Sequence, residues 1–289
     1  MSPVPLTQSQ RNALIDTSLA LLVQEQPEAQ RLVDAVSAGS PDRGRLALRA
    51  LLTMRPAAPL PERLQASLDQ LLSAEAAERE TVDARDLPGM PLDPRLSLWR
   101  GDITTIRADV IVNAANSALL GCFQPLHACI DNAIHSAAGP GLRQECAGIM
   151  AARGRPEPTG TATVTGGYHL PAAHVIHTVG PIVQGKPTAE HEALLASSYQ
   201  SCLLAAEDLR ATSIALCCIS TGVFGYPKTE AAIIAVRTVR EFLPRCQSLR
   251  KVVFNVFDPI DESIYRDLLG PDQRGADNDS TPIRRGLPC

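Results

Sequence analysis

Short β-rich runs alternate with helical stretches between residues 96 and 257, and this alternation restricts the possible folds more than any other feature. The expected strands are Leu96–Trp99, Val110–Val112, Thr161–Thr165, His174–Val179, Ile214–Ile219 and Val252–Phe257. The expected helices lie near His127–Ala138, Gly141–Arg153, Glu190–Arg210 and Thr229–Phe242. Strands that alternate with helices predict an α/β domain with a central, largely parallel or mixed sheet.

The first 94 residues are predicted to form a helical extension that ends in a linker. Thr7 followed by Gln10 has the form of a helix capping box, and leucines then recur at helical spacing. Residues 87–94 are rich in proline, which is typical of a connector. The extension has no cysteine, histidine or aromatic residue. We interpret it as a packing element, and whether it covers the sheet or shapes the site of a target protein stays open.

Composition excludes several functional classes. The 289 residues carry a net charge of −4 and only 3% aromatic residues, which argues against a nucleic-acid-binding protein. No apolar run approaches the ~18–20 residues that cross a membrane, and the first residues lack the pattern of a signal peptide. We therefore expect a cytoplasmic protein whose eight cysteines are reduced. The polar tail, residues 271–289, is predicted to be disordered.

Several of the expected strands are followed by residues suited to ligand binding. Ligands of such sheets bind at the carboxyl ends of the strands. Gly101–Ile103, Asn113–Asn116 and Ser220–Gly225 each follow a strand, and Asp258 follows the last one. The two glycines of Ser220–Gly225 allow a tight turn before a helix near Pro227, which suits a diphosphate. The spacing matches neither a P-loop nor a dinucleotide fingerprint, so this loop taken alone is better interpreted as a plain strand–helix turn.

The order of four motifs is more specific than any one of them. GDIT, VIVNAANSALLG, CIDNAIHSAAG and STGVFGYP follow one another between about Leu96 and Leu269. In this order they resemble a macrodomain. The resemblance implies a three-layer α/β/α sandwich with a central mixed sheet over residues 95–270, which binds ADP-ribose.

The resemblance also implies a role for individual residues. Asp102 would accept a hydrogen bond from the adenine amine, with Ile103 beside it, and Asn116 would contact the distal ribose. Phe257, at the end of the strand that contains Asn255, is the candidate stacking ring. The loop that would wrap the diphosphate consists of Ser220, Thr221, Gly222, Val223, Phe224 and Gly225.

A second constellation points to a metal. Cys122, His127 and Cys129 lie within eight residues of one another and offer two thiolates and an imidazole, a suitable donor set for zinc. Their spacing is no generic zinc motif, so two buried cysteines and a polar histidine at a helix start are the alternative. The segment resembles the zinc-dependent subgroup of macrodomains, which also has a helical N-terminal extension. We therefore expect one Zn²⁺ per chain, with three protein ligands and an open position.

Asp131 and His135 follow on the next expected helix and are the nearest potential fourth ligands. The resemblance implies that Asp131 lies near the distal ribose, whereas helix capping or support of a ligand is the alternative. His135 is expected to be a packing histidine with satisfied hydrogen bonds. The other six cysteines are expected to be inert, and no metal role is expected for His169, His174, His177 and His191, which have no cysteine or carboxylate at metal spacing.

The function implied is a hydrolase that removes mono-ADP-ribose from modified protein side chains. Asn116 would hold the ribose, and Asp131 would act as a base or orienting group. A non-catalytic ADP-ribose reader, and a hydrolase of a small ester such as O-acetyl-ADP-ribose, remain open alternatives. A thiol redox protein is disfavoured because Cys217 and Cys218 are adjacent. No nucleic-acid or membrane partner is expected.

Overall fold

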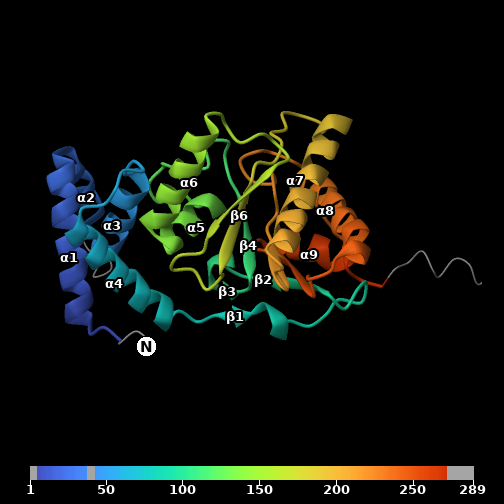
Figure 1. Cartoon of the computed structure of the whole chain (residues 1–289), viewed down its shortest axis with the longest axis horizontal. Helices are drawn as coiled ribbons and strands as arrows, with labels where there is room; N and C mark the ends of the chain where they lie inside the picture. Colours follow the sequence, from blue (N-terminus) through green and yellow to red (C-terminus); the bar gives the residue numbers. More distant parts are fainter. Residues whose placement is uncertain (1–4, 38–42, 272–289) are drawn as a thin grey trace, which may run out of the picture.

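The computed structural model describes residues 5–37 and 43–271, so the predicted disordered tail lies outside the described residues from position 272 onward. Four helices come first and form a bundle beside the α/β domain (Figure 1). Their bounds are Gln8–Glu25 (α1), Gln30–Ser37 (α2), Arg43–Met54 (α3) and Glu62–Glu78 (α4). The predicted capping box is confirmed, because the Thr7 hydroxyl accepts from the Gln10 amide while the Gln10 side chain accepts from the Thr7 amide.

The α/β domain is built on a six-stranded mixed sheet in the order β2-β8-β7-β4-β6-β5. All neighbouring strands are parallel except β5, which is antiparallel to β6. The strands are Leu96–Arg100 (β2), Val110–Ala114 (β4), Ala162–Gly166 (β5), His174–Thr178 (β6), Ser213–Leu216 (β7) and Lys251–Val256 (β8). A separate two-stranded ladder joins Val82–Asp83 (β1) to Ile106–Arg107 (β3). The predicted mixed sheet is confirmed.

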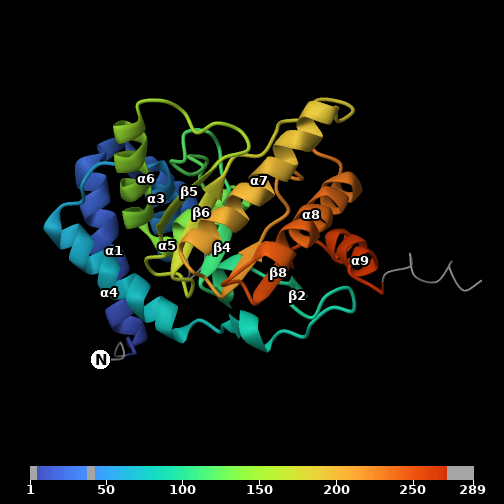
Figure 2. The same cartoon turned by 45° about the vertical axis from the view of Figure 1, so that its right-hand side comes forward.

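Helices cover both faces of this sheet, which gives the predicted three layers. In Figures 1 and 2, α5 and α6 lie on the face next to the N-terminal helices, and α7, α8 and α9 lie on the other face. Their bounds are Ile130–Ala138 (α5), Pro140–Arg153 (α6), Ala189–Asp208 (α7), Lys228–Phe242 (α8) and Pro259–Leu268 (α9). The N-terminal bundle therefore adds a further layer outside α5 and α6.

Two hydrophobic cores hold these parts. The sheet and its helices share one large core, while the N-terminal helices form their own around Leu48, Leu64, Leu68 and other leucines. The stripes expected in α1, α3 and α4 thus pack mainly against each other. Across residues 5–37 and 43–271, none of the helices combines the length and the apolar character needed to cross a bilayer.

The structure corrects three local expectations. Strand β7 ends at Leu216, so Cys217 and Cys218 follow the strand instead of lying in it, because the chain turns there and the Ile219 amide donates to the Cys217 carbonyl. Helix α5 begins only at Ile130, which leaves His127 in an irregular loop. Helices α2 and α9 were not among the expected elements.

Glu207 fastens the last turn of α7 to the segment before β8. Its carboxylate accepts from the amides of Gln247, Ser248 and Leu249 at 2.8, 3.1 and 2.8 Å. Burial acts to raise the pKa of Glu207, but the hydrogen bonds from the three amides outweigh it and lower this pKa to about 2. We expect Glu207→Gln to lower the free energy of unfolding by about 1–2 kcal/mol at neutral pH.

A depressed pKa in the folded state means that this stabilisation is complete above the unfolded pKa near ~4.3 and is lost as the pH falls towards about 2. Urea unfolding of both proteins at several pH values measures this: the difference should shrink with acidification. The exposed Glu241 on α8 gives the control, Glu241→Gln, which should change stability at no pH. A constant difference for Glu207→Gln would contradict the account.

Candidate active site

A cleft opens at the carboxyl ends of β4, β7 and β8, as the predicted topology requires. Residues from several of the predicted motifs meet there. Its lining includes Asn116, Cys122, His127, Cys129, Asp131, Ser220, Thr221, Gly222, Val223, Phe224 and Phe257. Asp102, Ile103 and Gly225, which were also expected in the site, do not line this cleft.

The loop from Ser220 to Gly225 presents unpaired backbone donors. Ser220 and Gly225 have φ of 68° and 71°, and the Tyr226 amide donates to the Ser220 carbonyl across the turn. Within the described part of the chain, the amides of Gly222, Val223 and Phe224 have no hydrogen-bond acceptor. Such amides just before a helix favour an anion. The loop is therefore suited to bind phosphate groups.

Gly180, which follows the end of β6, allows this loop to approach the chain closely there. A Cβ atom built on Gly180 would lie 2.1 Å from the Ser220 Oγ and 2.6 Å from the Ile219 Cγ2. Any side chain at this position would therefore displace the start of the loop from Ser220 to Gly225. Sequence reasoning missed Gly180, because no local pattern shows which backbone a distant loop will touch.

Asp131 lies on the first turn of α5 and is 6% exposed. Asn113 donates to its Oδ1 at 2.8 Å, and Asn116 lies 3.4 Å from its Oδ2. Asn116 also donates to the Gly121 carbonyl. Burial raises the pKa of Asp131 to about 6, against the opposing effect of the Asn113 hydrogen bond. The structure thus brings Asn116 and Asp131 together as a polar pair at one end of the cleft.

Cys122, His127 and Cys129 gather beside this pair. Their sulfur and nitrogen atoms all lie within 4.8 Å of one another, and the Cys122 Sγ is 3.4 Å from the His127 Nδ1. The Cys129 thiol caps α5 by accepting from the Asn132 amide, and burial raises its pKa to about 11. Tetrahedral zinc with Zn–S of ~2.3 Å and Zn–N of ~2.0 Å keeps its ligands roughly 3.5 Å apart. The donor set and its spacing therefore fit zinc, with one side facing the cleft.

Neither Asp131 nor His135 joins this group. His135 instead lies with Cys146 and His177 in a second, buried group, which gives His177 a cysteine neighbour in space that its sequence spacing did not indicate. Sequence spacing could not reveal it, because the three side chains come from α5, α6 and β6. His135 is buried as expected, but among the described residues neither ring nitrogen has a hydrogen-bond partner, and the Asp131 Oδ1 is 3.5 Å away. Burial lowers the His135 pKa well below its usual value, so the ring is neutral.

The opposite end of the cleft carries an exposed aromatic ring. Phe257 follows β8 with 80% of its surface exposed, so its ring is free to stack on a planar ligand. Asp102 caps a short turn, with its Oδ1 accepting from the Thr104 amide. Asn255 links the two segments by donating to the Gly101 carbonyl. The adenine roles of Asp102 and Ile103 stay predictions.

Sequence reasoning also missed Asp261, which lines this end of the cleft and pairs with Lys228 at 3.0 Å. Its signal was present in part, because Asp258 followed by Pro259 marks the start of a helix. Lys228 also lies 3.1 Å from Asp258, so one lysine ties the starts of α8 and α9 together.

The fold and cleft define a three-layer α/β/α domain with a ligand site at the strand ends. A family model described as Macro domain matches residues 112–235. A "Protein-ADP-ribose hydrolase" from Treponema medium is 46% identical over 79% of this chain and 88% of its own length. One from Staphylococcus aureus (strain MRSA252) is also 46% identical, over 78% of this chain and 84% of its own length. The chain belongs to the macro domain family.

Solved structures agree with this assignment. The Trypanosoma brucei macrodomain in complex with ADP-ribose has a TM-score of 0.59 and 31% identity, and the match covers 80% of this chain and 96% of that one. The Oceanobacillus iheyensis macrodomain with ADP has a TM-score of 0.54 and 41% identity, over 60% of this chain and 88% of that one. The longer coverage of the Trypanosoma brucei match shows that the similarity extends beyond the sheet domain.

Proposed function

We propose that this chain is a zinc-dependent hydrolase that removes mono-ADP-ribose from modified protein side chains. The names of the relatives that are 46% identical support the hydrolase. The observation that supports the zinc dependence is the meeting of Cys122, His127 and Cys129 in one cleft. The same cleft contains the Ser220–Gly225 loop, whose free amides are suited to bind phosphate groups. Binding adenine and phosphates needs no metal, so such a donor set at the far end favours chemistry over recognition alone.

The chemistry of each part of the cleft suggests one orientation for ADP-ribose. The diphosphate would accept from the free amides of Gly222, Val223 and Phe224. The adenine would stack on Phe257, which leaves the distal ribose beside Asn116 and Asp131. The scissile bond, which joins the anomeric carbon to the protein side chain, then lies next to the three metal-binding side chains.

Hydrolysis breaks the bond between the anomeric carbon and the protein side chain, joins a water oxygen to that carbon and leaves a water proton on the released side chain. A zinc ion held by Cys122, His127 and Cys129 would supply a Lewis acid at this place. The Asn116 amide would hold a ribose hydroxyl, with its own carbonyl oxygen fixed by the Ala118 amide at 3.0 Å. Asp131 would accept the proton of water or of a ribose hydroxyl at a carboxylate oxygen, and Asn113 keeps that carboxylate oriented.

A cytoplasmic location stays a prediction.

Release of ADP-ribose from a mono-ADP-ribosylated protein, with and without a zinc chelator, tests the proposal. We expect release by the zinc-loaded protein, loss of release after chelation and recovery when zinc is restored. Metal analysis should find about one zinc per chain. Undiminished release by the metal-free protein would overturn the zinc dependence. Tight binding of ADP-ribose without any release from protein would make the chain a reader, and release from O-acetyl-ADP-ribose alone would change the substrate.

Gly180→Ala should weaken ADP-ribose binding at least tenfold, because the new Cβ would push Ser220 and with it the free amides. A tenfold change corresponds to ~1.4 kcal/mol, within the ~1–3 kcal/mol that overpacking costs. Calorimetric titration with ADP-ribose measures it. Gly148→Ala on α6 is the matched control, because its Cβ meets nothing within 4 Å and should leave the affinity unchanged. Equal affinities of both variants would contradict the proposed loop contact.

A further inference from the structure

We propose that the N-terminal helical extension holds the loop of residues 121–129, which carries Cys122, His127 and Cys129, through the positioning residues Arg143 and Asn132. Part of the extension thereby becomes a support of the active site. The inference uses the proposed function to explain why the loop must be ordered. The order of the loop itself can be tested without metal or substrate.

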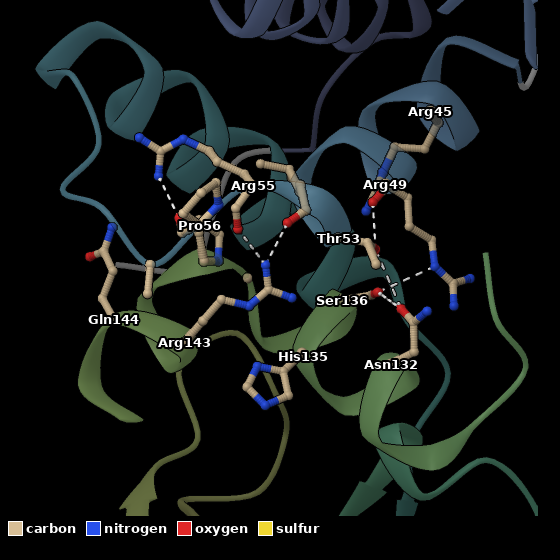
Figure 3. Close-up of a pocket in the computed structure, with 14 residues that line it drawn as sticks. Arg45, Arg49, Thr53, Arg55, Pro56, Asn132, His135, Ser136, Arg143 and Gln144 are labelled. Carbon is tan, nitrogen blue, oxygen red and sulfur yellow. Dashed lines mark hydrogen bonds between the residues drawn. The ribbon is translucent and has the colours of Figure 1, made fainter. Parts of the chain in front are cut away.

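Arg143 on α6 connects the extension to the start of the loop. It is 6% exposed, and its Nη1 donates to the carbonyls of Leu52 and Arg55 at 3.0 and 2.7 Å (Figure 3). These carbonyls lie at the end of α3, where no further turn of the helix can pair them and where a positive charge is favourable. The Arg143 Nε donates to the Leu120 carbonyl at 2.7 Å, and the guanidinium lies 4.5 Å from the centre of the Phe123 ring.

Asn132 on α5 makes a second connection. Its Nδ2 donates to the Gln124 carbonyl at 3.0 Å, and its amide donates to the Cys129 Sγ at 3.4 Å. Its Oδ1 accepts from Ser136 at 3.0 Å and lies 3.4 Å from the Thr53 hydroxyl of α3 (Figure 3). One side chain thus contacts both the loop and the extension.

A third contact supports the same side of α5. The Arg49 Nε of α3 donates to the Ser136 hydroxyl at 3.3 Å, which is itself bonded to Asn132 (Figure 3). The end of α3 therefore reaches α5 and α6 through polar side chains at three places. An extension that only covered apolar surface would not need such contacts to the carbonyls around the loop.

The loop has little support of its own. It contains no helix or strand between Gly121 and Cys129, and Leu126 adopts a positive φ of 57°. Phe123 and Leu126 are 43% and 40% exposed. Segments with few internal hydrogen bonds and exposed side chains open at low free-energy cost unless other elements hold them. The contacts through Arg143 and Asn132 restrain the loop and keep its two cysteine side chains and its histidine side chain in place.

Amide hydrogen exchange of the metal-free protein tests the inference. We expect Arg143→Gln to raise the exchange of residues 121–129 at least tenfold while α8 stays at its wild-type rate. Thr53→Val removes a hydroxyl of the extension with little change in volume and should raise loop exchange about threefold. Arg45→Gln breaks a pair with Glu75 inside the extension and is the control, with no change in the loop.

Competition with a chelator provides the second readout. Zinc affinity should fall about tenfold in Arg143→Gln, within the ~10–100-fold that loss of ligand support costs elsewhere. Wild-type loop exchange in both Arg143→Gln and Thr53→Val would overturn the inference, as would a rise that is equal throughout the protein. If Arg143→Gln fails to fold, Thr53→Val alone decides. Should the protein bind no zinc, the exchange result still stands, so failure of the proposed function is recognised separately.

Discussion

Cys122→Ser is expected to lose its zinc and at least about 100-fold in hydrolysis, while ADP-ribose binding stays within about threefold of wild type. The Cys122 sulfur is one of three donor atoms that lie within 4.8 Å of one another and would hold the metal, so its removal leaves only His127 and Cys129. A Lewis acid contributes several kcal/mol at the transition state, and each ~1.4 kcal/mol is a factor of ten in rate. The residues proposed to contact the adenine and the diphosphate lie elsewhere in the cleft, so these contacts should persist.

Cys246→Ser provides the same chemical change far from the cleft. Cys246 is partly buried after α8, where its thiol lies 3.8 Å from the Phe242 carbonyl. This variant should keep its zinc and its activity. Metal analysis and single-turnover release of ADP-ribose from a modified protein compare the two. A Cys122→Ser protein without zinc but with full activity would remove the metal from the proposed mechanism.

The sequence predicts the meeting of Cys122, His127 and Cys129 because the three residues are close together in the chain. Cys122, His127 and Cys129 fall within one loop, so proximity follows from chain length whatever the fold. The buried group of His135, Cys146 and His177 is different, since it forms only when α5 and α6 pack on β6. Side chains that meet only through tertiary packing have no characteristic spacing in the sequence, so such a group cannot be predicted from it.

The sheet was predictable for a related reason. Each strand is a short β-rich run, and the alternation with helices restricts the topology to a few arrangements. The end of β7 at Leu216 could not be predicted from the sequence. Cys217 and Cys218 continue the apolar run, although the backbone already turns towards the cleft at these residues. A hydrophobic run predicts that its residues are buried, and Cys217 is indeed buried. It does not predict where strand pairing ends.

The extension shows a further limit. It was expected to carry no chemistry because it lacks cysteine, histidine and aromatic side chains. The groups through which it contacts Arg143 are backbone carbonyls of Leu52 and Arg55, which every residue possesses. Leucine stripes predict that a helix packs, but they do not reveal which terminal carbonyls receive a partner from another domain.

Asp131→Asn is expected to lower kcat about 100-fold, in the range lost with a general acid or base, and to leave ADP-ribose affinity within about threefold. The amide keeps the volume of the carboxylate, and its oxygen can still accept from Asn113. It cannot take a proton from water or a ribose hydroxyl. Zinc content should remain at the wild-type level, because Asp131 does not belong to the Cys122, His127 and Cys129 group.

Asp69→Asn is the control for this change, because Asp69 lies on α4, half-exposed and 3.7 Å from His169, away from the cleft. Its kcat should equal that of wild type. Steady-state kinetics, ADP-ribose titration and the melting temperature are measured on the same preparations. Wild-type kcat in Asp131→Asn would contradict the role given to the carboxylate. A loss of kcat that is matched by an equal loss of ADP-ribose affinity would instead make Asp131 a binding residue, since only an interaction formed in the transition state lowers kcat alone.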